Sequence, residues 1–263
     1  MNASKLKISV ASDLHLEYYK DWKSKIPRFD QDSDVVILAG DISTGDRLYE
    51  GVREIAKNHP HSEIVVVAGN HEYYDCEYSA RLREMREEFS DIERAHLLEN
   101  DALQIKGYHI LGCTLWTGFD ILGETLTDVS KDYCRHRISD FQAIQFQDGL
   151  LDPDDIIRFY NNSRNWLAQQ LATKECSKCI VITHFPPCEE TSHPGFGIST
   201  MTSYFQANCI DLIDEYQPAL WIYGHNHWSQ DTGIGKTRLY SNQLGYPSER
   251  ETIPSFSLRS LIE

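Results

Sequence analysis

Five short polar clusters stand out because each directly follows an apolar run and carries a carboxylate, an imidazole or a carboxamide. The clusters are Asp13-Leu14-His15, Gly40-Asp41, Gly69-Asn70-His71-Glu72, His184 and Gly224-His225-Asn226-His227. Oxygen and imidazole ligands of this kind suit Mn, Fe, Zn, Co or Ni, and the clusters contain no cysteine for a structural zinc. Each cluster alone has an ordinary explanation, such as a strand exit or a helix cap. Five of them in one chain predict a metal site.

The number of candidate ligands bears on the number of metals. Asp13 and His15 alternate along the chain, as do His225 and His227, and alternate residues of an extended segment point the same way. Such pairs can bind one metal ion or two adjacent metal ions. A set of four histidines, two aspartates and one asparagine is more than one tetrahedral ion needs, and a bridging carboxylate can complete both shells of a two-metal site.

The elements that must position these clusters are strands. Apolar runs rich in β-branched residues predict buried strands, and α/β proteins place their ligands on loops beyond the carboxyl ends of such strands. We therefore expect the clusters to converge. The predicted strands are Leu6 to Ala11, Val35 to Ala39, Ile64 to Ala68, Ile110 to Cys113, Ile180 to Thr183 and Leu220 to Tyr223.

Helical periodicity lies between several of these runs, and the pattern changes near the end of the chain. Segments of alternating polarity around Gly235-Lys236 predict a late hairpin, so the sheet should be mixed. This order indicates a single α/β domain over residues 1–263, with sheets packed together and helices outside. The predicted helices are Asp46 to Asn58, Tyr78 to Phe89, Asp154 to Leu171 and Ser203 to Glu215, and the hairpin strands are Ser229 to Ile234 and Thr237 to Asn242.

Composition limits the classes of partner. The net charge of −15 disfavours nucleic acid and anionic membranes at long range unless a bound metal reverses the local field, although the acidity could serve solubility alone. The seven scattered cysteines fit a reducing compartment, and no apolar run resembles a signal peptide or a membrane span. We therefore expect a soluble, cytoplasmic protein. Its oligomeric state is not predicted.

The five clusters, in their order along the chain, resemble the signature of the calcineurin-like metallophosphoesterases: D-x-H, G-D, G-N-H-[ED], an isolated H and G-H-x-H. They extend from Asp13 to His227 and so span most of the chain. The resemblance implies a four-layer α/β/β/α sandwich with two mixed β-sheets. It also implies two divalent transition metal ions, with Mn favoured over Fe, Zn, Ni or Co, and hydrolysis of a phosphate ester by metal-activated water.

The resemblance also assigns roles to single residues. His71 corresponds to the catalytic histidine, which hydrogen-bonds the phosphate and protonates the leaving oxygen, and Asn70 is also expected to contact the substrate. Asp41 is expected to bridge the two metals. The remaining ligands are Asp13, His15 and His227 on one metal and Asn70, His184 and His225 on the other.

Departures from the best-known branches narrow the class. Thr44 and Gly45 stand where the protein Ser/Thr phosphatases have an Asp and an Arg, and purple acid phosphatases have no histidine like His15. The chain therefore resembles the small bacterial-type members. The missing Asp leaves His71 without its usual orienting carboxylate, for which Asp46 and Glu72 are the candidates.

The stretch Gly118 to Gly149 shows no clean helix or strand period and predicts a long substrate-selecting excursion within residues 114–150. Arg135 and Arg137 belong to a local basic cluster there, which could bind a second phosphate or a leaving group, or could be a solvated face. The expected reaction is hydrolysis of a phosphodiester in a small nucleotide-like substrate. A phosphomonoesterase, a nuclease and a non-catalytic interaction module stay open as alternatives. Aromatic residues that adjoin the motifs could stack a planar group or simply pack: Tyr73, Tyr74, Trp116 and Trp228.

Overall fold

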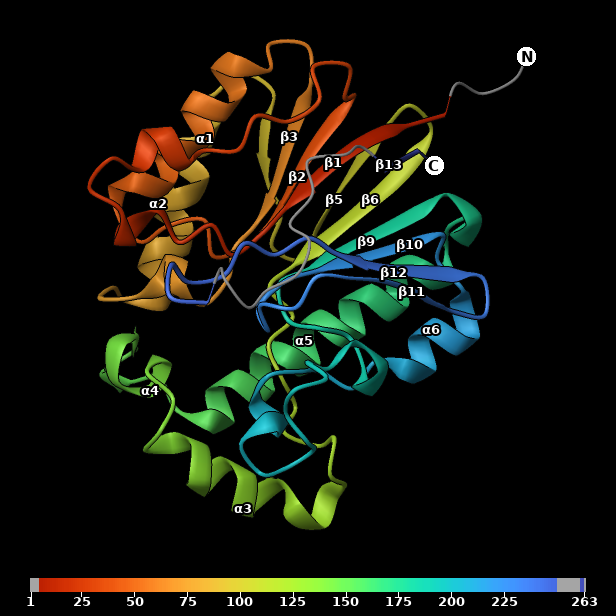
Figure 1. Ribbon diagram of the computed structural model, residues 1–263. Coiled ribbons are helices and arrows are strands. Elements are labelled where there is room, and N and C mark those ends of the chain that lie inside the picture. The colour runs from red at the N-terminus through yellow and green to blue at the C-terminus, as the bar shows by residue number, and fades with distance from the viewer. Residues whose placement is uncertain (1–4, 250–260, 263) are drawn as a thin grey trace.

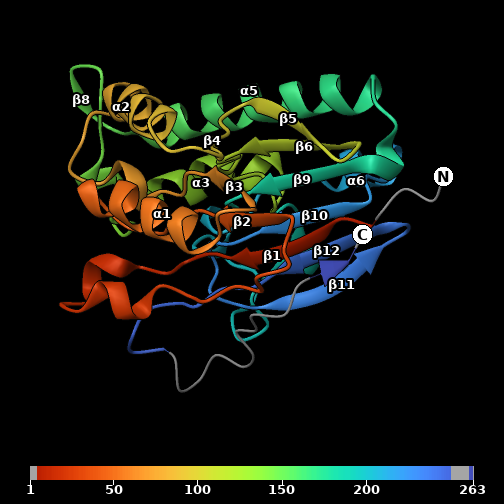
Figure 2. The same cartoon turned by 90° about the horizontal axis from the view of Figure 1, so that it is seen from above.

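The computed structural model of the chain describes residues 5–249 and 261–262. Two β-sheets pack face to face and helices cover their outer faces, so the predicted four-layer α/β/β/α sandwich is confirmed (Figure 1). Helices α1 (Asp46–Asn58) and α2 (Tyr78–Ser90) lie outside the first sheet. Helices α5 (Pro153–Ala172) and α6 (Ile210–Tyr216) lie outside the second, and Figure 2 shows α5 running along it.

Each sheet is parallel at its centre and antiparallel at an edge. The first has the order β13-β1-β2-β3-β4, in which only β13 runs antiparallel to its neighbour. Its strands are β1 (Lys7–Ala11), β2 (Val35–Ala39), β3 (Glu63–Val67), β4 (Ala95–Leu97) and β13 (Leu261–Ile262).

The second sheet has the order β11-β12-β10-β9-β6-β5, and its antiparallel pairs are β5 with β6 and β11 with β12. The predicted late hairpin is therefore confirmed. The strands are β5 (Asp101–Ile105), β6 (Tyr108–Cys113), β9 (Cys179–Thr183), β10 (Leu220–Tyr223), β11 (Gln230–Ile234) and β12 (Thr237–Ser241).

The central strands are apolar on both faces because each face has its own core. Alternate residues of the two sheets, such as Ile37 and Ile182, pack together between the sheets. The residues between them in sequence, such as Leu38 and Val181, pack under the helices. Burial on both faces explains why these strands are continuous apolar runs without a period of two.

The excursion is more regular than the sequence predicted. Although the sequence shows no clean period there, residues 118–150 contain α3 (Glu124–Arg135), α4 (Asp140–Ala143) and a hairpin of β7 (Gln145–Phe146) and β8 (Gly149–Leu150). Helix α3 buries only Ser130 and Cys134, whereas Leu126, Val129 and Tyr133, which recur at helical spacing, are exposed. Both α3 and α4 project beyond α5, away from the sheets (Figure 1).

The predicted helix Ser203 to Glu215 was also wrong in its first half. A single 3₁₀ turn covers Thr202–Tyr204, and α6 begins only at Ile210. The intervening backbone is extended along a neighbouring loop, because the amides of Ala207 and Cys209 donate to the carbonyls of Pro186 and Pro187, both at 2.8 Å. None of the described helices is long and apolar enough to cross a bilayer.

Candidate metal centre

The five polar clusters meet at one edge of the sandwich, because they follow β1, β2, β3, β9 and β10. Backbone hydrogen bonds join one strand exit to another. The Asp13 amide donates to the Gly40 carbonyl at 3.0 Å, and the Gly224 amide donates to the His184 carbonyl at 2.9 Å. Within each sheet, neighbouring strand exits are therefore held together by the backbone alone.

The sequence argument assumed that the candidate ligands alternate along extended segments, but the backbone at these residues is not extended. Asp13, His15, Asp41, His225 and His227 all have positive φ, between 47° and 75°. Left-handed backbone is costly for residues with a Cβ and is concentrated at functional sites. These side chains therefore converge because the chain bends sharply at each strand exit.

One group of candidate ligands consists of Asp13, His15 and His227. The Nε2 atoms of the two histidines lie 3.1 Å apart, and His227 Nε2 is 3.5 Å from Asp13 Oδ1. Each residue offers a ligand atom within 4.8 Å of the others. Two imidazole nitrogens and a carboxylate that face one point form a suitable donor set for a divalent transition cation.

A second group consists of Asp41, His184 and His225, again with ligand atoms within 4.8 Å of one another. His184 donates from Nδ1 to the Ala39 carbonyl at 2.8 Å, which leaves its Nε2 as the ligand atom. That nitrogen lies 3.1 Å from Asn70 Oδ1. The buried Nε2 of His225 has no hydrogen-bond partner within the described part of the chain, which is what a site built for a cation would show.

Asp41 lies between the two groups. Its Oδ2 is 3.4 Å from His184 Nε2 and 3.9 Å from His15 Nε2, so one carboxylate faces ligands of both groups. Asp41 also belongs to an intermediate group with His15 and His71. The seven residues expected to bind metal therefore surround one space, and their chemistry fits two adjacent divalent cations.

The acidic residues hold protons on the histidines of the metal-free protein. Burial lowers the pKa of His71 and that of His184, but the neighbouring acids, with Asp41 the strongest, together raise both to about 9. Burial and the neighbouring His184 together keep the pKa of His225 well below its usual value. The charges of Asp13 and Asp41 are thus matched to positive charge, whether from protons or from metal ions.

His71 is oriented by Glu17, not by Asp46 or Glu72. One oxygen of Glu17, Oε1, lies 3.1 Å from His71 Nδ1 and 3.0 Å from His15 Nδ1. Burial raises the pKa of Glu17, but the hydrogen bonds from both histidines lower it to about 2, so the carboxylate stays ionised. The sequence argument missed this residue, although it stands two positions after His15 and directly extends the first cluster.

Glu72 instead ties two strand exits together. Its carboxylate accepts the amides of Asp41 at 2.9 Å, Ile42 at 2.7 Å and Gly69 at 2.6 Å. The glycine cannot be replaced here, because a Cβ on Gly69 would lie 2.2 Å from Asp41 Oδ1. Glu72 and Gly69 therefore set the position of the ligand Asp41 rather than the orientation of His71.

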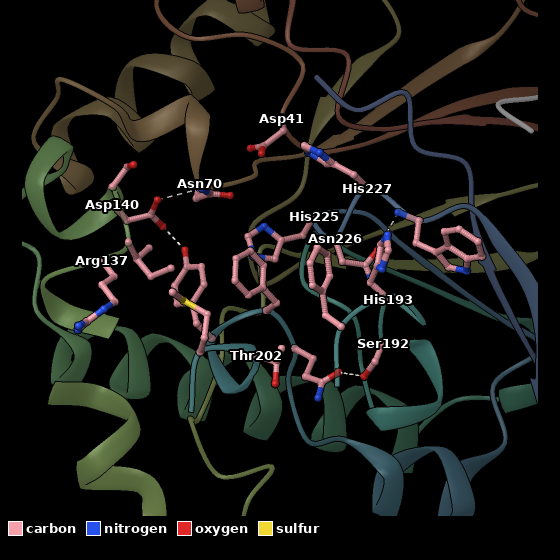
Figure 3. Close-up of a pocket in the computed structure, with 18 of the residues that line it drawn as sticks. Asp41, Asn70, Arg137, Asp140, Ser192, His193, Thr202, His225, Asn226 and His227 are labelled. Carbon is pink, nitrogen blue, oxygen red and sulfur yellow. Dashed lines mark hydrogen bonds between the residues drawn. The ribbon is translucent and has the colours of Figure 1, made fainter. Parts of the chain in front are cut away.

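Asp140 is a second residue that the sequence argument missed. It comes from α4, is buried, and accepts the Asn70 amide nitrogen at 3.0 Å and the Tyr74 hydroxyl at 2.7 Å, together with the Tyr204 hydroxyl (Figure 3). The bond to Nδ2 turns Asn70 Oδ1 toward His184. The excursion thus contributes to the metal centre through an acid rather than through its basic residues.

The basic cluster of the excursion does not gather at the centre. Arg135 forms an ion pair with Asp152 and is not part of the cavity wall. Arg137 does line the cavity above the centre, with its guanidinium 3.9 Å from the centroid of the Tyr133 ring.

The aromatic residues near the motifs divide between the core and the cavity. Tyr73 and Trp116 are buried in the core, whereas Trp228 lines the cavity and Tyr74 stacks on His71 with centroids 4.3 Å apart.

Comparison with known proteins matches residues 6–229 to the family described as "Calcineurin-like phosphoesterase". "Uncharacterized protein L509" of Acanthamoeba polyphaga mimivirus is 26% identical over 276 residues, covering 94% of this chain and 93% of that protein. Among solved structures, the phosphopantetheinyl hydrolase of Mycobacterium tuberculosis superimposes with a TM-score of 0.77 at 16% identity, covering 98% of this chain and 96% of that one. TT1561 of Thermus thermophilus superimposes with a TM-score of 0.50 at 14% identity, covering 91% and 90%. These two similarities concern the fold.

Proposed function

Because the chain belongs to the calcineurin-like phosphoesterase family, whose chemistry is metal-dependent hydrolysis of phosphate esters, we propose that it cleaves a phosphodiester in a small, nucleotide-like substrate. The observation that carries this proposal is the placement of the Asp41 carboxylate between two groups of buried ligands. We assign Asp13, His15 and His227 to one ion and Asn70, His184 and His225 to the other. Mn is the proposed metal, with Fe, Zn, Ni and Co as alternatives.

Two bound divalent cations would supply Lewis acidity that activates a water molecule and offsets the charge on phosphorus. The protein's own residues would hold the two cations and orient the proton donor. Asp41 faces both ligand groups, and Glu17 keeps Nδ1 of His71 protonated and so presents Nε2 toward the centre. His71 then donates a proton to the leaving oxygen as the general acid.

The charges around the cavity favour a diester over a monoester. Arg137 is the only lysine or arginine among the described residues of the cavity wall. A monoester dianion needs more positive charge than a diester monoanion, and the arginines that hold phosphate in the protein phosphatases have no counterpart at Gly45 or Ala68. The cavity thus suits a singly charged phosphate.

The size of the cavity favours a small substrate over a nucleic acid. Its volume of about 740 Å³ lies within the range of about 300–1,000 Å³ typical of small-molecule sites. The net charge of −15 also gives little long-range attraction for a polyanion.

The free thiols of the cysteines fit a reducing compartment, and we propose a cytoplasmic location.

A hydrolysis panel with added Mn²⁺ tests the proposal. It compares bis(4-nitrophenyl) phosphate, 4-nitrophenyl phosphate, cyclic nucleotides, dinucleotides, a phosphopantetheinyl carrier protein and single-stranded DNA. We expect the small diesters to give the highest kcat/KM and the Asp41→Asn variant to lose activity on all of them. Preference for a monoester or for DNA would replace the diester assignment, and bound metal without any hydrolysis would favour an interaction module.

A further inference from the structure

The metal centre forms only the floor of the cavity, and the wall above it is mostly apolar (Figure 3). Arg137 and Asp140 lie on one side of the space and His193 and Asn226 on the other. We call the part of the cavity farther from the candidate metal ligands the apolar chamber, and we define it by six of its lining residues. These are Ile138, His193, Phe196, Met201, Phe205 and Trp228.

We propose that the apolar chamber binds an uncharged aromatic substituent of the substrate and thereby determines specificity. This inference rests on the proposed function, because it names the group attached to the phosphate that the metal centre hydrolyses. The chamber residues come from the turn after α3, from the segment between β9 and α6 and from the loop after β10, so three separate segments form one wall.

Rings along the chamber provide surfaces for stacking. The His193 ring lies 4.7 Å from the Phe196 ring and 5.1 Å from the Trp228 ring, measured between centroids. The side chain of Phe196 is 67% exposed, although a large apolar residue is normally covered. A planar ligand would cover this surface, because offset stacking and edge contacts are the favoured arrangements of aromatic pairs.

The chamber is continuous with the metal centre. The Phe205 ring stacks on the ligand His225, with centroids 5.3 Å apart and an interplanar angle of 27°. A substituent on a phosphate held beside His225 would therefore lie next to Phe205, in the same cavity that Phe196 and Trp228 line.

The charges of the chamber disfavour a second phosphate. The Asp140 carboxylate is held by two tyrosine hydroxyls and Glu249 by His227, while burial lowers the pKa of His193 and keeps that ring neutral. Arg137 is the one lysine or arginine that the described wall provides. An uncharged substituent matches this environment better than a polyphosphate chain.

The test uses diesters that share the 4-nitrophenolate leaving group and differ in the second substituent: methyl, phenyl, 1-naphthyl and a nucleoside that carries an additional 3′-phosphate. We expect kcat/KM to rise from methyl to naphthyl and to fall for the last compound, because of its second phosphate. In Phe196→Ala and Trp228→Ala the naphthyl-to-methyl ratio should fall by ~5- to 100-fold, the usual effect of removing a stacking partner. Leu150→Ala, an equally exposed apolar residue outside the cavity, should keep the wild-type ratio.

A flat series in the wild type, with hydrolysis intact, would overturn the chamber assignment and leave the proposed function standing. If no diester is hydrolysed, the proposed function fails, and the chamber is then tested by calorimetry with 1-naphthyl methylphosphonate against dimethyl phosphate. Tighter binding of the naphthyl compound that is lost in Trp228→Ala supports the chamber. Equal binding of both compounds refutes it.

Discussion

Replacement of Glu17 by Gln is the sharpest test of how the centre controls proton transfer. One oxygen of Glu17 takes hydrogen bonds from His15 and His71 at 3.0 and 3.1 Å, and its pKa of about 2 means that both bonds are made to a carboxylate at any practical assay pH. Glutamine keeps the shape of the side chain but has no charge. Its carbonyl oxygen can take the place of Oε1 and accept both bonds as weaker neutral ones, while its NH₂ group replaces Oε2, which is buried without a hydrogen-bond partner among the described residues.

The expected losses of kcat and of metal affinity in Glu17→Gln follow from these two hydrogen bonds. A hydrogen bond to a charged group contributes ~1.5–3 kcal/mol, which corresponds to roughly 10- to 150-fold in an equilibrium or a rate. Weakening of the bond to His71 from a charged to a neutral one should therefore lower kcat by up to about that factor. Weakening of the bond to His15 should reduce the affinity of one metal site by up to roughly 10- to 100-fold, the usual cost of removing a partner of a metal ligand.

The assay measures kcat at saturating Mn²⁺ for diesters with leaving groups from 4-nitrophenolate to an aliphatic alcohol. If Glu17 orients the proton donor, the loss in Glu17→Gln grows as the leaving group becomes more basic, because only poor leaving groups need the proton. Glu17→Asp should recover part of the activity, since it restores the charge.

Glu249→Gln is the matched control. Glu249 accepts a hydrogen bond from Nδ1 of the candidate ligand His227 at 2.6 Å. Its variant should weaken metal binding without changing the dependence on the leaving group. If Glu17→Gln shows the same pattern as this control, Glu17 does not position His71, and the reasoning is refuted.

Four further predictions concern the ligands and their supports. Asp41→Asn should reduce metal content and kcat more than His15→Ala, as seen by elemental analysis and rate, and near-normal values would exclude a bridging role. His71→Ala should keep its metals and lose ~10²–10⁴ in kcat, less with nitrophenolate, whereas loss of metal would make it a ligand. Mn²⁺ binding should tighten as pH rises from about 6 to about 9, because His227 must lose a proton before it can bind the metal. Burial lowers the pKa of the metal-free His227 imidazole, but its hydrogen bonds to carboxylates raise it to about 10. Calorimetry in two buffers measures the proton release, and a pH-independent affinity would contradict this prediction. Asp140→Ala should lower metal affinity by roughly tenfold, because it removes the hydrogen bond that orients the carboxamide of Asn70. An unchanged binding isotherm would show that Asn70 does not need this bond.

The fold and the convergence of the candidate ligands could be predicted because their signals are local. Each ligand directly follows an apolar run, and a strand end can be recognised from its own residues without knowledge of its neighbours. The four layers came from the resemblance instead, and the two faces of strands such as β2 explain why: a strand that is apolar on both faces does not reveal how many layers cover it.

The supports of the site could not be predicted because they are tertiary. Glu17 meets His71 across 54 positions of sequence, and Asp140 meets Asn70 across 70. A carboxylate in a loop gives no sign of which distant histidine it will contact. Helix α3 was missed although Leu126, Val129 and Tyr133 recur at helical spacing, and the structure leaves these side chains exposed.

The motifs encode a scaffold as well as a set of ligands. Gly69 leaves room for Asp41, and Glu72 holds the amides of both strand exits, so two of the four residues in Gly69-Asn70-His71-Glu72 serve geometry alone. The left-handed backbone at Asp41 costs free energy that these hydrogen bonds offset. A fold that needed only stability would not maintain strained backbone around a buried imidazole nitrogen, His225 Nε2, that has no hydrogen-bond partner among the described residues. The scaffold is thus explained by the metal-binding chemistry it positions.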